Sequence, residues 1–143
     1  MLEDIRSLAP RAQPVLVGYP RLVPEDTARC LTPAPGQTRL PLADIPQDAM
    51  PVLDRIQKRL DDVMKKAAAD LGADYVDLYA RTGGNTVCDG ADRGIGGLLE
   101  TSSSLLPWYA HPNEKGRDIQ AGTVAGRVVE ILGRAEAGVG RRS

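Results

Sequence analysis

Two short apolar runs with one amphipathic helix between them limit most strongly what this chain can fold into. PVLVGYP, residues 14–20, and DYVDLYA, residues 74–80, are continuous enough in apolar side chains to be strands buried on both faces, as in a parallel sheet. Between them, apolar residues recur at intervals of three and four and predict a helix with one buried stripe: Leu53, Ile56, Leu60, Val63 and Ala67. Strand, helix and strand make a βαβ unit with a right-handed crossover.

The ends of the helices can be placed from their flanking residues. Residues 2–8 are typical of the last turns of a helix. Asp48 is predicted to cap the start of the central helix, and Gly72 is predicted to cap its end. Asn113 is predicted to cap a final helix, whose buried stripe is Ala121, Val124, Ala125, Val128, Ile131 and Leu132. The glycines of this helix are expected to let it approach the sheet closely: Gly116, Gly122 and Gly126.

Two long segments carry no regular hydrophobic pattern. Seven of the eleven prolines lie in residues 20–51, which predicts a surface loop with a short helical turn near residues 24–29. Residues 81–112 are rich in Gly and Ser and predict a second loop. Loops of this length in a compact domain are usually functional or poorly ordered.

Helix, strand, helix, strand and helix give an α/β layer arrangement with only two strands. Two parallel strands make a poor independent sheet, because both faces and both edges need cover. The sequence therefore predicts part of a larger domain. An uncovered strand edge is also expected to make the chain prone to self-association.

The composition excludes several classes of function. The formal net charge is −1, so electrostatics gives no argument for a nucleic-acid partner. With one Trp, four Tyr and no Phe, a base-stacking surface is not expected. No run is long enough to span a membrane, and the first residues do not resemble a signal peptide. If Met1 is the true start, a cytoplasmic protein is expected.

The two cysteines, Cys30 and Cys88, leave two interpretations open. They are either buried free thiols or a disulfide. A disulfide would stabilise the fold by about 4 kcal/mol in the chain-entropy model. It would also imply export from the cytoplasm. Because an export signal is missing, a disulfide would indicate that the N-terminus is incomplete.

His111 is the only histidine in the chain. It follows the second predicted strand, and ligand sites of doubly wound folds lie at the carboxyl ends of strands. Pro112 biases the backbone of His111 away from the helical region, which fixes the chain beside the imidazole. From the residues alone, His111 is either a catalytic base or an ordinary turn residue.

Four segments together resemble the SGNH, or GDSL, hydrolases, most closely the secreted actinobacterial esterases and lipases. WYAHPNEKG is similar to the family's last sequence block, in which the catalytic His precedes Pro and Asn ahead of the C-terminal helix. IRSLAPRAQPVLVGYPRLVPED resembles the entry to the fourth strand, and LDRIQKRLDDVMKKAAADLGADYVDLYA resembles the following helix and fifth strand. RTGGNTVC is similar to a loop with a disulfide cysteine, which implies a Cys30–Cys88 bridge.

The resemblance implies a partial three-layer, flavodoxin-like α/β fold that consists of the last two parallel strands with flanking helices. Residues 1–135 would form this C-terminal portion of the domain, and residues 136–143 would be a disordered tail. His111 takes the position of the general base, which accepts the proton of a nucleophilic serine and returns it to the leaving alkoxide.

The group that orients His111 is less clear from the resemblance. Many family members carry an Asp three residues before the His, where this chain has Trp108. The resemblance implies that the backbone carbonyl of Trp108 accepts a hydrogen bond from the second ring nitrogen instead. Three carboxylates are alternatives for this role, each interpreted as a surface carboxylate: Asp89, Asp92 and Asp118.

The blocks that supply the family's nucleophile and oxyanion donors, Gly-Asp-Ser and Gly-x-Asn-Asp, are absent. Gly83, Gly84 and Asn85 are interpreted as turn residues, and Ser102–Ser104 are interpreted as part of a loop rather than as nucleophiles. The chain thus resembles the C-terminal half of the family alone. One histidine without clustered ligands gives no metal site, and no cofactor is implied.

Two functions follow. The first is the base-bearing half of a carboxylic ester hydrolase, secreted by family resemblance, which acts on ester or lipid substrates when an N-terminal half completes it. The second is a non-catalytic truncated remnant or interaction module. The chain alone is expected to be inactive. Four leucines of the second loop either line an acyl pocket or anchor the loop: Leu98, Leu99, Leu105 and Leu106.

Overall fold

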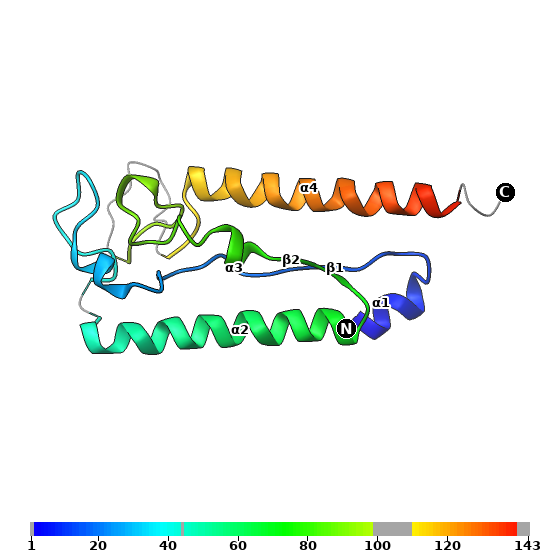
Figure 1. The fold of residues 1–143 in the computed structure, drawn as a ribbon, viewed down its shortest axis with the longest axis horizontal. Coiled ribbons are helices and arrows are strands. Elements are labelled where there is room, and N and C mark those ends of the chain that lie inside the picture. The colour runs from blue at the N-terminus through cyan, green and yellow to red at the C-terminus, as the bar shows by residue number, and fades with distance from the viewer. Residues whose placement is uncertain (1, 44, 99–109, 140–143) are drawn as a thin grey trace.

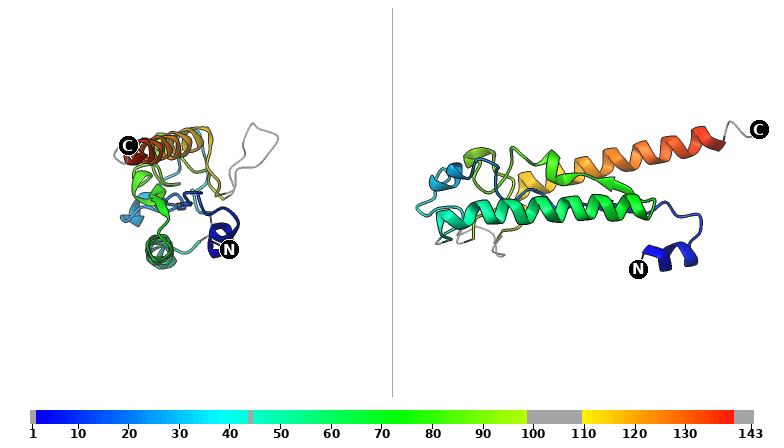
Figure 2. Two further views of the ribbon diagram at one scale, coloured as in Figure 1. Left: turned by 90° about the vertical axis from the view of Figure 1, so that its right-hand side faces the viewer. Right: turned by 60° about the horizontal axis from the view of Figure 1, so that its bottom comes forward.

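The computed structural model of the chain describes residues 2–43, 45–98 and 110–139. Two strands, β1 (Val15–Val17) and β2 (Asp74–Val76), form a parallel sheet between two long helices, α2 (Met50–Asp70) and α4 (Glu114–Val139) (Figure 1). The end-on view shows α2 and α4 on opposite sides of the strands (Figure 2). The predicted arrangement of helices around two parallel strands is therefore confirmed.

The strands are shorter than the apolar runs that predicted them. Val15 pairs with Asp74, and Val17 pairs with Val76. The predicted strand over residues 74–80 is wrong after Val76, because the Asp77 carboxylate accepts a hydrogen bond of 2.8 Å from the Ala80 amide. This cap starts a short helix, α3 (Leu78–Arg81), which turns the chain out of the sheet.

The end of α2 was predicted correctly, and its start was not. Gly72 has a φ of 57°, and the Ala73 amide donates to the Ala68 carbonyl at 2.8 Å, which closes the helix in a Schellman motif. Asp48 lies within a 3-10 turn, η2 (Gln47–Ala49), and Ala49 occupies the cap position without a side-chain hydrogen bond. The predicted cap at Asp48 is therefore wrong.

The apolar stripe of α2 does not form the interface with this sheet. Ile56, Leu60 and Val63 are 59%, 43% and 49% exposed. A polar side chain of α2 meets β2: Asp61 is 6% exposed and accepts a hydrogen bond of 2.9 Å from the Tyr75 hydroxyl. The apolar Ala68 of the same helix is also buried. The predicted burial of the stripe is thus wrong for these three residues, whereas Leu53 and Ala67 are half-buried.

The final helix is longer and less buried than predicted. α4 continues to Val139, four residues into the segment predicted as a disordered tail. Ile131 is buried, whereas Val128 and Leu132 are exposed. A Cβ atom added at Gly122 or Gly126 would meet nothing within 4 Å, so these glycines do not serve a close approach to the sheet. None of the helices in the described residues is long and apolar enough to cross a membrane.

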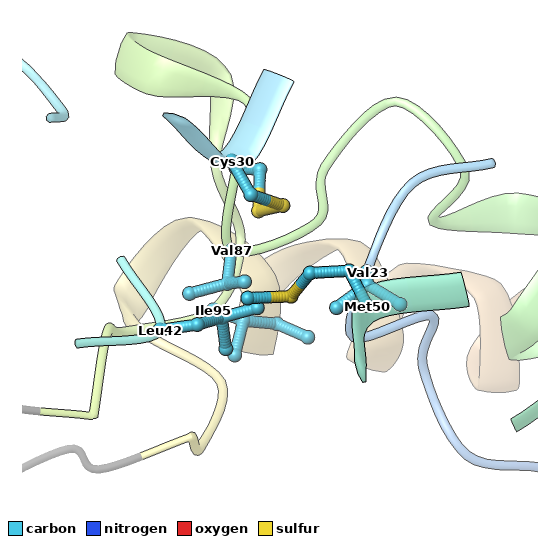
Figure 3. Close-up of a cluster of buried hydrophobic side chains, with 7 residues drawn as sticks. Val23, Cys30, Leu42, Met50, Val87 and Ile95 are labelled. Atoms are coloured by element: carbon cyan, nitrogen blue, oxygen red, sulfur yellow. A yellow bond between two sulfur atoms is a disulfide. The ribbon is translucent and has the colours of Figure 1, made fainter. Parts of the chain in front are cut away.

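The hydrophobic core lies beyond the carboxyl ends of the strands (Figure 1), where side chains of the two predicted loops pack together (Figure 3). A disulfide joins Cys30, on a 3-10 turn, η1 (Thr27–Leu31), to Cys88 of the second loop, with 4.7 Å between the Cα atoms. Neither predicted loop is simply a surface loop, because both bury side chains in this cluster: Val23, Cys30, Leu42, Met50, Val87, Cys88 and Ile95.

The disulfide is expected to dominate stability. Replacing both cysteines, Cys30→Ala with Cys88→Ala, should lower the free energy of unfolding by about 4 kcal/mol, because the bridge closes a long loop in the unfolded chain. Urea unfolding of the oxidised chain and of the double variant measures this. Reductant should destabilise the native chain and leave the variant unchanged, and equal sensitivity of both would contradict the prediction.

A second anchor joins α4 to β2 through Asp74. Its Oδ1 accepts from the guanidinium groups of Arg134 and Arg127 at 2.6 and 2.7 Å, and its Oδ2 accepts from Gln13 at 3.0 Å. The hydrogen bond from Arg134, with the charges of both arginines, holds the pKa of Asp74 below its usual value.

Asp74→Asn should therefore destabilise the chain at pH 7. A lowered folded-state pKa contributes stability above the unfolded pKa, near 4 for Asp, and this stability is lost as the pH falls through the folded-state value. Urea unfolding at pH 7 and pH 3 should show a deficit that shrinks in acid. Asp70→Asn, in the exposed pair with Lys66, is the control with little effect. A deficit of equal size at both pH values would refute the role of charge.

Candidate active-site histidine

His111 lies just before α4, at the end of the molecule to which the carboxyl ends of β1 and β2 lead (Figure 1). Its side chain is exposed. Among the described residues, no group makes a hydrogen bond to the imidazole. In doubly wound folds, ligand sites lie at this end of the parallel strands.

A short antiparallel pairing fixes the backbone of His111. Ile95 and Pro112 form an isolated bridge. On one side of it the Gly96 amide donates to the His111 carbonyl at 3.0 Å, and on the other the Asn113 amide donates to the Gly94 carbonyl at 3.0 Å. Pro112 sits in the non-hydrogen-bonded position of this pairing, where a missing N–H costs nothing.

Asn113 locks the other side of His111. Its Oδ1 accepts from the Gly116 amide at 2.9 Å, which confirms the predicted helix cap. Its Nδ2 donates to the Arg93 carbonyl at 3.0 Å. One side chain thus joins the start of α4 to the loop that carries the bridge, and the sequence had indicated the cap alone.

Ala110, which precedes His111, has a φ of 51°. This left-handed conformation is unfavourable for a residue with a Cβ atom and persists only where the surroundings impose it. Alanine gives no sequence signal for such a conformation, so it could not be predicted. It turns the chain sharply into the paired segment of His111.

The loop that holds His111 leads back to the disulfide. The Gly94 amide donates to the Asn85 carbonyl at 2.8 Å, and the Asn85 side chain donates to the Asp92 carbonyl at 2.7 Å. The Asn85 amide closes a turn onto the Thr82 carbonyl at 2.9 Å, which agrees with the interpretation of Gly83, Gly84 and Asn85 as turn residues. Cys88 lies within this bonded segment, so the bridge to Cys30 ties the support of His111 to the core.

The three carboxylates weighed for orienting His111 have other roles or face solvent. The Asp89 side chain is 1% exposed, pairs with Arg29 and accepts from the Thr86 amide and hydroxyl at 2.6 and 2.8 Å, so its interpretation as a surface carboxylate is wrong. Asp92 is exposed and pairs with Lys115 at 2.7 Å, and this contact lowers the pKa of Asp92. Asp118 is exposed.

Several predicted residues lie outside the described residues: Trp108, Ser102–Ser104, Leu99, Leu105 and Leu106. Leu98 is described and packs against the core cluster, which favours the interpretation of an anchor.

A groove of about 870 Å³ runs between α4 and β2, and His111 does not line it. The described residues contain no group of three or more side chains suited to hold a metal ion.

Asn113→Ala should lower the free energy of unfolding by about 1–2 kcal/mol, because it removes a helix cap and a half-buried hydrogen bond. Asn113→Asp should cost less, since its carboxylate still caps α4 and loses only the donor to Arg93. Urea unfolding of the two variants measures this order. If Asp and Ala were equally destabilising, the hydrogen bond to Arg93 rather than the cap would carry the effect.

Comparison with known proteins gives two relatives. No protein-family model matches the sequence. An esterase of Streptomyces scabiei is 70% identical over 139 residues, which are 94% of this chain and 40% of that protein. Lipase 2 of Streptomyces coelicolor is 32% identical over 134 residues, which are 92% of this chain and 40% of that protein. The chain therefore spans about 40% of the length of these relatives.

The fold is similar to a solved structure. Phospholipase A1 from Streptomyces albidoflavus NA297 superimposes with a TM-score of 0.62 over 87% of this chain and 47% of that chain, at 22% identity. At this identity the likeness concerns the fold alone. Over nearly its whole length, the chain is similar to a part of proteins named esterase and lipase, which supports a family of hydrolases.

Proposed function

We propose that this chain is the base-bearing portion of a serine esterase or lipase of the SGNH/GDSL family, with His111 as the general base. The observation that carries the proposal is the placement of His111: an exposed imidazole on a backbone fixed from both sides, at the carboxyl ends of parallel strands. The identity of 70% to an esterase, over a region that includes nearly the whole chain, supports the same reaction class.

In this proposal His111 accepts the proton of a serine hydroxyl while the serine oxygen attacks the ester carbonyl. The imidazolium then returns the proton to the leaving alkoxide, and a second cycle with water releases the acid. The backbone carbonyl of Trp108 accepts a hydrogen bond from the N–H of the other ring nitrogen. This role for a carbonyl is favoured by the other engagements of Asp89 and Asp92.

In this proposal the nucleophilic serine comes from the part of the domain that corresponds to the unmatched part of the relatives. β1 pairs on one side with β2, and the described residues supply no strand for its other edge. The exposed stripe of α2, Ile56, Leu60 and Val63, also lacks cover. A further strand with its helix would satisfy both needs, and would carry the serine and oxyanion donors to His111.

Secretion is part of the proposal. The Cys30–Cys88 disulfide is the supporting observation, since structural disulfides persist in oxidising compartments. The substrates are esters or lipids, in keeping with the names of the relatives. Self-association through the edge of β1 is the expected behaviour of the chain when that edge stays uncovered.

A chimera tests the function. This chain replaces its 70% identical counterpart in the Streptomyces scabiei esterase, and hydrolysis of p-nitrophenyl butyrate is measured. The chimera should be active, and His111→Ala should lower kcat by roughly a thousandfold, the size of a lost general base. Asp118→Asn should leave kcat unchanged, because this exposed carboxylate has no role in the proposal. An active chimera that is indifferent to His111→Ala would exclude His111 as the base.

The chain alone gives the complementary test. Treated with a fluorophosphonate serine-hydrolase probe, it should show no adduct in a non-reducing intact mass, because its nucleophile is supplied from elsewhere. The same spectrum should lie two hydrogens below the reduced mass. An adduct would place a nucleophile within these residues and would redirect attention to Ser102–Ser104.

A further inference from the structure

Among the glycines of α4, Gly116 alone packs closely against another backbone segment, at Gly94. A Cβ atom on Gly116 would overlap the Gly94 carbonyl oxygen, whereas a Cβ on Gly122, Gly126 or Gly133 would meet nothing within 4 Å. Gly116 is in the first turn of α4, and its φ is not positive. Its backbone therefore does not require glycine, and glycine costs about 1 kcal/mol relative to alanine within a helix. The contact with Gly94 is the remaining physical reason for a glycine at position 116.

Gly94 has little freedom to move away from Gly116. Its amide donates to the Asn85 carbonyl at 2.8 Å, and its carbonyl accepts from the Asn113 amide at 3.0 Å. A Cβ on Gly94 itself would lie 3.1 Å from both the Asn85 carbonyl oxygen and the Gly116 Cα. Any shift of Gly94 must stretch or break bonds on both of its sides.

The same segment holds His111. Two residues after Gly94, the Gly96 amide donates to the His111 carbonyl at 3.0 Å, and Ile95 between them is buried and bridges to Pro112. A displacement of Gly94 relative to α4 is therefore transmitted to the backbone on which the imidazole stands. His111 is thus hydrogen-bonded to the segment of residues 94–96 and lies three residues before the start of α4.

We propose that Gly116 is a positioning residue for His111: its missing side chain lets the backbone of α4 rest on Gly94, and this contact sets where the imidazole stands. The inference rests on the proposed role of His111 as a base. Gly116 itself touches neither substrate nor the reacting atoms. It acts through the paired segment alone.

The single histidine makes a direct test available, because its imidazole gives one unambiguous set of NMR signals. Three variants of the whole chain are compared: Gly116→Ala, Gly94→Ala and the matched control Gly126→Ala. Gly126→Ala should leave the His111 imidazole and Gly96 amide signals in place and raise the melting temperature, since alanine favours the helix. Gly116→Ala should move both signals while those of Asp74–Val76 stay in place.

Gly94→Ala keeps the inference testable if Gly116→Ala does not fold. Its contacts are tight without overlapping, so it should fold and give smaller shifts of the same two signals. A folded Gly116→Ala or Gly94→Ala variant with unmoved His111 signals would overturn the inference. These spectra do not depend on hydrolysis, so their outcome is separate from that of the proposed function.

In the active chimera the positioning role predicts a specific kinetic pattern. Gly116→Ala should lower kcat by roughly ten- to a hundredfold, as expected for a misplaced base, with KM nearly unchanged. Gly126→Ala should leave both constants unchanged. A rise of KM alone, with kcat retained, would contradict a role in positioning the base.

Discussion

The disulfide between Cys30 and Cys88 is the constraint on which the rest of the structure depends. A sheet of two three-residue strands buries too little to organise a chain of this length. The cluster around the disulfide supplies the core instead, from Val23 and Leu42 on one loop to Val87 and Ile95 on the other. Order in this chain is therefore concentrated at the carboxyl ends of the strands, where the candidate base lies.

In contrast to the two loops, α2 leaves much of its apolar surface exposed. Two of its polar side chains make long-range hydrogen bonds: Gln57 bonds to the backbone of Leu22 and Val23 in the first loop, and Asp61 bonds to Tyr75 of β2. Its apolar stripe is exposed. A helix with such an exposed apolar stripe would gain free energy if another element buried that stripe. In the proposed enzyme, the part of the relatives that this chain does not span would supply the cover.

Local signals in the sequence predicted two of the three helix caps, and the cap at Asp48 was the exception. Gly72 and Asn113 lie where the caps of α2 and α4 were expected, because each acts through bonds to its own helix. Orientation and length were harder to predict. The stripe of α2 was assigned to the core because periodicity identifies an apolar face without saying what covers it. β2 ends at Val76 because the Asp77 side chain caps α3. The apolar residues continue past Asp77, so the sequence pattern predicted a longer strand.

The position of His111 depends both on local sequence signals and on contacts between distant segments. Its neighbour Pro112 and the cap at Asn113 are visible in the sequence, whereas the pairing with residues 94–96 and the contact between Gly94 and Gly116 join segments about twenty residues apart. All these contacts lie within the described part of this chain, and none needs a nucleophile in order to form. A general base is effective only when its geometry is set before the reaction. In the proposed enzyme this chain would therefore deliver a base whose backbone is already positioned, and the remaining portion would have to supply a serine and its oxyanion donors in matching register along β1.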